Sequence, residues 1–229
     1  MVIDDLERGN YDFDTELPKG LHEYYQHSFY LLGIDDRNYI LMNILILLSF
    51  VRAGLSTTDL EDYLSCHFSL TTEDIHRSLK FGKSFFRMGS DNSWNLFHNS
   101  LRDYITQSPN VKCLRDTNWN HFISWLQIAW KNSNIYAIEH ICEHLKERGE
   151  FECLLDLLHG EFLLRKLRLP QQDYGLLKDL AIGIEASMKT EPVVKSIGLI
   201  ATSALLNQRR HHRENYSYLF ARFMNSKEF

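Results

Sequence analysis

The tripeptide Gly82-Lys83-Ser84 could do chemistry, because a phosphate-binding P-loop ends in the same residue types. In a P-loop, backbone N–H groups and the lysine hold the phosphates, and another glycine stands about five positions before the one that precedes the lysine. Arg77 occupies that position here. The surrounding pattern also runs from helix to strand, whereas a P-loop joins a strand to a helix. We therefore interpret Gly82-Lys83-Ser84 as a match without phosphate-binding function.

His140 and His144 stand four residues apart, which is the spacing of two zinc ligands on one face of a helix. Glu143 lies between them, but the order His-Glu-x-x-His of zinc proteases is absent, and no third ligand stands at a suggestive spacing. We interpret the two histidines as a packed or solvated pair and expect no metal site. No arrangement of serine, histidine and aspartate indicates a nucleophile, so we predict that the chain is not an enzyme by itself.

Basic residues gather at positions 209–213, in the order Arg-Arg-His-His-Arg, where they could contact phosphates. The whole chain has a formal net charge of −5, which supplies no general attraction for nucleic acid or an anionic membrane. The helix expected at 73–80 would be the DNA-reading helix of a winged helix, yet it begins with Glu73 and Asp74 before the basic residues His76, Arg77 and Lys80. A helix of mixed charge suits the major groove of DNA poorly. We therefore interpret the basic residues at 209–213 as a charge cluster at a helix end or a domain interface.

These candidate residues lie in a chain of 229 residues that is 44% hydrophobic, which is typical of one large or two small globular domains. The apolar residues mostly repeat with the helical period of about 3.6, so we expect a mainly α protein. The four cysteines form no CxxC pair and follow no secretory signal, so we interpret them as reduced, mostly packing thiols in the cytoplasm. The most apolar run, 39–51, is too short to span a membrane, which takes about 20 residues.

A first domain is predicted at residues 33–112, after a linker and first helix at 1–32. Its central element is a helix at 39–53 that is apolar almost all round and must therefore be covered on several sides. The pair Asp35-Asp36 can cap this helix, and Gly54 can end it.

The rest of this domain consists of two short helices and a β-hairpin. Each helix begins at a capping-box pattern, at residues 56–59 and 71–74. Two short strands are expected at 85–88 and 94–97, around a loop rich in turn-forming residues. Three helices with a small β-hairpin are the elements of a winged helix.

A helix at 99–107, ended by Ser108-Pro109-Asn110, precedes a second domain at 113–229. Apolar residues there recur at helical spacing, and Asn132-Ser133-Asn134 and Gly149 separate the groups. Short loops between helices favour antiparallel neighbours, so we predict a helical-repeat (TPR-like) arm. The apolar positions expected to pack in the next helix are Tyr174, Leu177, Leu180, Ala181 and Ile184, and further helical groups occur at 194–205 and 216–223.

Three segments resemble STAND-class P-loop NTPases of the NACHT and apoptotic-ATPase type, which are switches that assemble on activation. Residues 17–25, Leu-Pro-Lys-Gly-Leu-His-Glu-Tyr-Tyr, are similar to the segment that leads from the nucleotide-binding core into the winged helix. Residues 96–104, Leu-Phe-His-Asn-Ser-Leu-Arg-Asp-Tyr, look like the family's histidine motif at the end of the wing. Residues 136–163 resemble the helical arm that follows. The resemblance covers about 17–167 in the family's order.

The resemblance implies a role for His98. In the family, the corresponding histidine reaches from the winged helix to the phosphates of bound ADP and helps to hold the closed, inactive state. This chain has Phe97-His98-Asn99 where signalling ATPases often have Met-His-Asp. Alternatively, His98 simply caps the helix that carries Leu101 and Tyr104.

The sequence contains no P-loop, no acidic strand for magnesium and no βαβ pattern, so ADP or ATP would be bound only with a partner or a further NTPase domain. We expect a non-catalytic module that relays nucleotide or ligand state into conformational change and assembly. Its expected partners are an NTPase domain, of the same gene or a separate chain, and signalling proteins, with a possible oligomer and no membrane. The alternatives are a winged-helix regulator that binds nucleic acid and a stand-alone helical protein-interaction adaptor.

Overall fold

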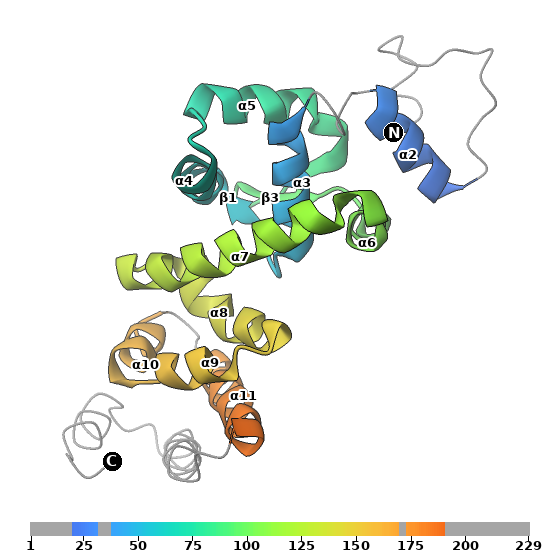
Figure 1. Cartoon of the computed structure of the whole chain (residues 1–229). Helices are drawn as coiled ribbons and strands as arrows, with labels where there is room; N and C mark the ends of the chain where they lie inside the picture. The colour runs from blue at the N-terminus through green and yellow to red at the C-terminus, as the bar shows by residue number, and fades with distance from the viewer. Residues whose placement is uncertain (1–19, 32–37, 170–172, 191–229) are drawn as a thin grey trace. The chain divides into compact units, whose positions relative to one another are not determined.

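The computed structural model describes residues 20–31, 38–169 and 173–190. Within these residues the chain is mainly helical and contains a small three-stranded antiparallel sheet, which confirms the predicted fold class at this level (Figure 1). Two compact units meet within one helix, the first ending at Ser124 and the second beginning at Trp125. The division into domains at 33–112 and 113–229 stays a prediction.

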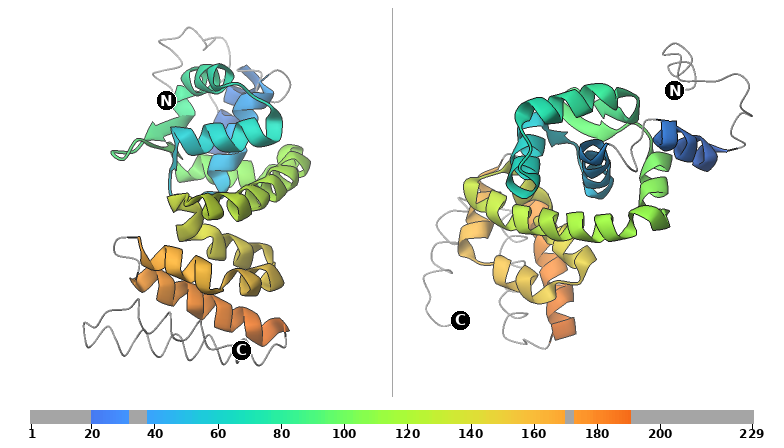
Figure 2. Two further views of the ribbon diagram at one scale, coloured as in Figure 1. Left: turned by 90° about the vertical axis from the view of Figure 1, so that its left-hand side faces the viewer. Right: turned by 45° about the horizontal axis from the view of Figure 1, so that its top comes forward.

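The first unit consists of helices and the small sheet, and Figure 2 shows it from two further sides. The strands pair in the order β1-β3-β2, with Leu55 opposite Trp94 and Phe86 opposite Leu96. Two 3-10 turns, η1 (Lys83–Phe85) and η2 (Pro109–Val111), join helices to their neighbours. The elements in chain order are α2 (Leu21–Leu31), α3 (Tyr39–Phe50), β1 (Leu55–Ser56), α4 (Thr57–Phe68), α5 (Thr72–Phe81), β2 (Phe86–Met88), β3 (Ser93–Leu96), α6 (Asn99–Gln107) and α7 (Lys112–Ala129), of which α7 continues into the second unit.

Helix α3 is the centre of the first core, as its all-round apolar sequence predicts: every residue from Leu41 to Phe50 is buried. It ends at Phe50, so the predicted end at Ala53 is wrong, because Val51 is already extended and leads into β1. Gly54 has a different purpose from ending the helix. A Cβ atom at Gly54 would lie 2.3 Å from the Ser93 hydroxyl oxygen, so glycine is required for the close approach to β3.

Both predicted capping boxes are present. The Ser56 side chain accepts from the backbone N–H of Asp59, and the Asp59 carboxylate accepts from the backbone N–H of Ser56. Thr71 and Asp74 make the same reciprocal pair at the start of α5. Each box satisfies backbone donors that a helix N-terminus otherwise leaves without partners.

Replacing Ser56 with alanine removes the cap of α4 and lowers the free energy of unfolding by about 1 kcal/mol. The matched control is Thr58→Ala, which changes an exposed residue in the same helical turn and stays within about 0.5 kcal/mol of wild type. Urea unfolding followed by circular dichroism measures both variants. Equal stability of the two variants would show that the capping box contributes nothing to α4.

The second unit contains only helices among its described residues. After α7 and the 3-10 turn η3 (Trp130–Asn132) come α8 (Ile135–Arg148), α9 (Phe151–Leu157), α10 (Gly160–Leu167) and α11 (Asp173–Thr190). The predicted separators are confirmed: Asn134 caps α8 by accepting from the N–H of Ala137, and Gly149 ends it at a φ of 77°. α11 packs against α8, α9 and α10.

The predicted apolar stripe of α11 is confirmed at Leu180 and wrong at Tyr174 and Ala181. Tyr174 is 73% exposed and Ala181 is exposed, whereas Leu176, Ile182 and Ala186, which were not predicted, are buried. The face of α11 that carries Asp179 is the buried face. Asp179 is itself buried, because it forms an ion pair in the core of the unit that an apolar pattern does not reveal.

Several predictions fall outside the described residues. These are the linker at 1–19, the cap at Asp35-Asp36, the helices at 194–205 and 216–223, and the basic cluster at 209–213. Of the cysteines, all four are free, but only Cys142 is buried, so the interpretation of them as mostly packing thiols is wrong for Cys66, Cys113 and Cys153. Among the described helices, none combines the length and the apolar character that crossing a membrane demands.

Candidate functional site

His98 lies directly after β3 and is the N-cap residue of α6. Its backbone is extended, with a φ of −142°, and its carbonyl accepts the first hydrogen bond of the helix from Leu101. The preceding residue, Phe97, is tied to the 3-10 turn by a 2.7 Å hydrogen bond from its N–H to the Phe85 carbonyl. Both His98 and Phe97 are exposed. The prediction that His98 caps the helix is confirmed.

The cap decides which ring nitrogen of His98 carries a proton. Nδ1 accepts from the Ser100 N–H at 3.2 Å and lies 2.7 Å from the Ser100 hydroxyl. That hydroxyl is in turn 2.7 Å from the hydroxyl of Tyr25 in α2. Because Nδ1 must offer its lone pair to a backbone N–H, the neutral imidazole carries its proton on Nε2. The exposed side chain therefore has an Nε2–H donor available to a ligand.

The Gly82-Lys83-Ser84 tripeptide has a structural place in the first unit. Gly82 is the C-cap of α5, and the next two residues begin the 3-10 turn that leads into β2. A Cβ atom on Gly82 would lie 2.4 Å from Cδ1 of Leu41, so glycine lets the chain pass close to α3. Ser84 is buried rather than presented to a ligand. The segment has neither the strand-to-helix context nor the exposed backbone of a phosphate loop.

The charges of α5 are largely paired within the first unit. Arg77 lies 2.8 Å from Glu73 and 3.9 Å from Asp74, one turn earlier on the helix. His76 lies 2.8 Å from Glu61 of α4. A helix whose arginine is neutralised by its own carboxylates is poorly suited to contact DNA phosphates.

His140 and His144 lie on α8 in the second unit and have different surroundings. His144 is fully buried, and its Nε2 lies 3.0 Å from the Tyr136 hydroxyl. His140 is partly exposed, and its nearest carboxylates are Glu139 at 3.9 Å and Glu143 at 4.0 Å. Burial lowers the pKa of His140 to about 4, against the pull of Glu143, so the ring is neutral at pH 7 and these contacts are not ion pairs there. Among the described residues, no group of three or more His, Cys, Asp or Glu side chains could hold a metal ion.

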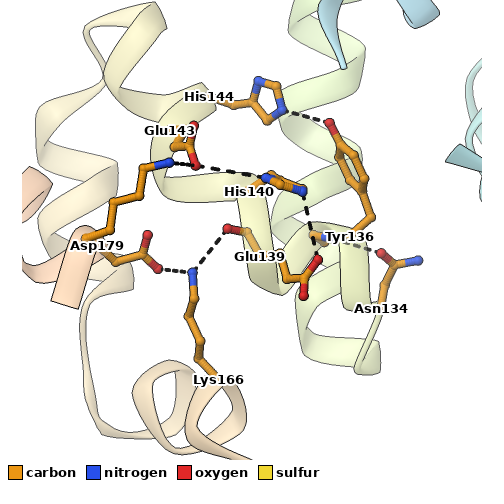
Figure 3. A network of polar contacts seen from close by, with 10 residues as sticks. Asn134, Tyr136, Glu139, His140, Glu143, His144, Lys166 and Asp179 are labelled. Carbon is orange, nitrogen blue, oxygen red and sulfur yellow. Dashed lines mark hydrogen bonds and ion pairs between the residues drawn. The ribbon is translucent and has the colours of Figure 1, made fainter. Parts of the chain in front are cut away.

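The least expected feature of the second unit is an ion pair in its core, between Lys166 of α10 and Asp179 of α11. Both side chains are 1% exposed, and the ammonium donates to Oδ2 of the carboxylate (Figure 3). The same ammonium also donates to the Glu139 carbonyl of α8 at 3.1 Å. One cation thus joins three helices.

Burial raises the pKa of Asp179 to about 6, while Lys166 opposes this shift. At pH 7 the carboxyl is therefore ionised and the pair is intact. Burial also raises the pKa of the neighbouring Cys142 thiol well above its ordinary value, so this cysteine is a poor nucleophile. No substrate reaches a lysine and an aspartate enclosed to this degree, and we assign them a structural role.

Two ion pairs with exposed lysines join α8 and α11. Lys178 of α11 lies 2.6 Å from Glu143 of α8, and Lys146 of α8 lies 2.6 Å from Glu185 of α11. Pairs with exposed lysines contribute little to stability, because water already solvates the ammonium groups.

No family model matches the chain, and no curated protein and no solved structure is similar to it at a significant level.

Proposed function

We propose that this chain is a regulatory, non-catalytic module of a STAND (NACHT-like) signalling NTPase. In this proposal, residues 33–112 are a winged helix and residues 113–229 a helical arm. The module binds ADP or ATP only together with an NTPase domain, from the same gene or a separate chain. It relays the nucleotide state to signalling proteins by packing differently in two states.

The order of elements in the first unit supports the winged helix. α3, β1, α4 and α5 precede the β2–β3 hairpin, and β1 pairs with β3 to complete a small sheet. In this arrangement the β2–β3 hairpin is the wing. The paired charges of α5 favour a protein partner over nucleic acid for this module.

The observation that carries the proposal is the placement of His98. It directly follows the last strand of the hairpin, is exposed, and has its Nδ1 held by Ser100. The remaining Nε2–H can donate a hydrogen bond to a phosphate oxygen. A hydrogen bond to an ionised acceptor contributes about 1.5–3 kcal/mol net, which is a bias of roughly tenfold to hundredfold between closed and open states.

ADP release from the assembled module tests this role. The chain is combined with a P-loop NTPase core loaded with labelled ADP, and complex formation is verified by gel filtration. His98→Ala is expected to release ADP roughly tenfold to hundredfold faster than wild type. His98→Asp keeps a good N-cap side chain but lacks the N–H donor, so it is expected to release ADP at least as fast as His98→Ala does.

His76→Ala is the matched control, because His76 is an exposed histidine of the same unit on α5. It is expected to retain ADP like wild type. If His98→Asp retains ADP while His98→Ala does not, the cap alone explains the effect. If both retain ADP in a verified complex, the nucleotide contact is wrong.

A further inference from the structure

Two histidine rings lie face to face between α4 and α7 in the first unit. The centroids of His67 and His121 are 4.7 Å apart, and the ring planes differ by 6°. The rings of Tyr63 and Phe68 pack around them, at 5.2 Å from His67 and 5.5 Å from His121 respectively. The pair therefore lies in an aromatic cluster that joins the end of α4 to the middle of α7.

Both histidines are half-buried, and one nitrogen of each ring is shielded from solvent. Nε2 of His67 and Nδ1 of His121 are buried and have no hydrogen-bond partner. A neutral imidazole tolerates one nitrogen without a partner better than a protonated ring does, because the protonated ring has N–H donors on both sides. Two protonated rings in parallel contact would also repel each other.

The groups that face the pair do not remove this cost. On α4, Asp62 acts on His67 and raises its pKa, but this effect is smaller than that of burial and of His121, which both lower it. The Tyr63 hydroxyl donates to Asn118 of α7, and burial raises its pKa, so it stays neutral. From α3, Tyr39 contributes a ring that contacts Phe68.

We propose that the His67–His121 stack is an acid-sensitive latch between α4 and α7, closed while the His67 ring is neutral and opened when it is protonated. The direction of the pH dependence follows from proton linkage. The folded-state pKa of His67 lies below 6.5, its ordinary value, so the opened chain binds protons more readily than the closed one. The stabilisation is complete above pH 6.5 and is lost as the pH falls through the folded-state value. The latch acts independently of any nucleotide.

Hydrogen exchange of the full chain at pH 7.5 and 5.5, corrected for intrinsic exchange rates, tests the latch. In wild type, amide opening in α4 is expected to increase at pH 5.5 by up to roughly tenfold, because one ring, His67, is protonated more easily in the opened chain. His67→Phe and His121→Phe keep a stacked aromatic pair. The first removes the titrating ring, and the second removes the imidazole that lowers the pKa of His67. Each is expected to show a smaller increase than wild type.

His76→Gln is the control for general effects of acid, because it removes an exposed histidine of α5 and leaves the stack intact. It is expected to keep the full wild-type increase. If the two phenylalanine variants also keep it, the latch is wrong. Should a phenylalanine variant not fold, NMR titration of the wild-type His67 ring decides: protonation below the range of an unstructured histidine is expected, and protonation within that range would overturn the proposal.

Discussion

Replacing Lys166 with methionine lowers the free energy of unfolding of the second unit by about 3–5 kcal/mol, because it leaves the buried Asp179 carboxylate without its partner. Methionine is close to lysine in length and is apolar, so the loss reports the missing charge rather than a cavity. Urea unfolding followed by circular dichroism measures it. Lys178→Met is the matched control: it removes a half-exposed lysine from its pair with Glu143 and is expected to change stability by about 0–1 kcal/mol.

The pH dependence of this loss separates charge from packing. Burial already raises the pKa of Asp179 to about 6, and removing Lys166 raises it further. A folded-state pKa above the ordinary 3.8 means that stability is retained at low pH and lost as the pH rises through the folded value. Lys166→Met is therefore expected to be closer to wild type at pH 5 than at pH 8. A loss that does not change with pH would contradict an electrostatic origin.

Removing both members of the pair should recover much of the stability. In Lys166→Met/Asp179→Leu no buried charge remains, and apolar replacements of buried ion pairs are often neutral or stabilising. The double variant is expected to be more stable than Lys166→Met alone at pH 8. If the stability lost in the double variant equals the sum of the losses in Lys166→Met and Asp179→Leu, the two side chains do not act as a pair.

Much of the first unit could be predicted because its signals are local. The capping boxes that begin at Ser56 and Thr71 satisfy backbone groups within four residues, so their sequence pattern is nearly sufficient. α6 begins and ends where the sequence predicts, since Ser108-Pro109 cannot continue a helix.

Strand β1 could not be predicted for the opposite reason. Leu55–Ser56 is only two residues long, too short for an alternating pattern. It is defined by its pairing with Trp94 and Ser93, which lie far away in the sequence. The same pairing draws the chain away from α3 at Val51, which is why the predicted helix end at Ala53 is wrong.

The candidate sites also differ in whether a local sequence signal or a long-range contact defines them. The cap made by His98 follows from its place before a helical stretch, whereas its contact with a nucleotide rests on the family resemblance and stays a prediction. The Lys166–Asp179 pair has no sequence signal, because lysine and aspartate are almost always exposed and are assigned to the surface in any apolar pattern. Likewise, the stacking of His67 on His121 depends on how α4 meets α7.

Replacing Asn118 with leucine lowers the free energy of unfolding of the first unit by about 2–3 kcal/mol, because it removes a donor from a buried amide. Asn118 and Asn43 are both fully buried, and the Asn118 amide donates to Oδ1 of Asn43 at 2.7 Å. After the change, this oxygen has lost its donor in the core. Tyr63 keeps the backbone carbonyl of residue 118 as an acceptor, so its hydroxyl is affected less.

A double-mutant cycle with Asn43→Leu distinguishes the missing partner from poor packing. Asn43→Leu/Asn118→Leu removes both polar groups of the pair, and replacing both partners by apolar groups is nearly neutral where the shapes fit. The double variant is therefore expected to lose less stability than the sum of the single variants, by about 1–3 kcal/mol. Tyr63→Phe, which removes one hydroxyl donor, provides the scale of a single hydrogen bond at about 1 kcal/mol. Strict additivity would mean that leucine at position 118 destabilises by crowding, and that the contact between α3 and α7 does not depend on the two amides.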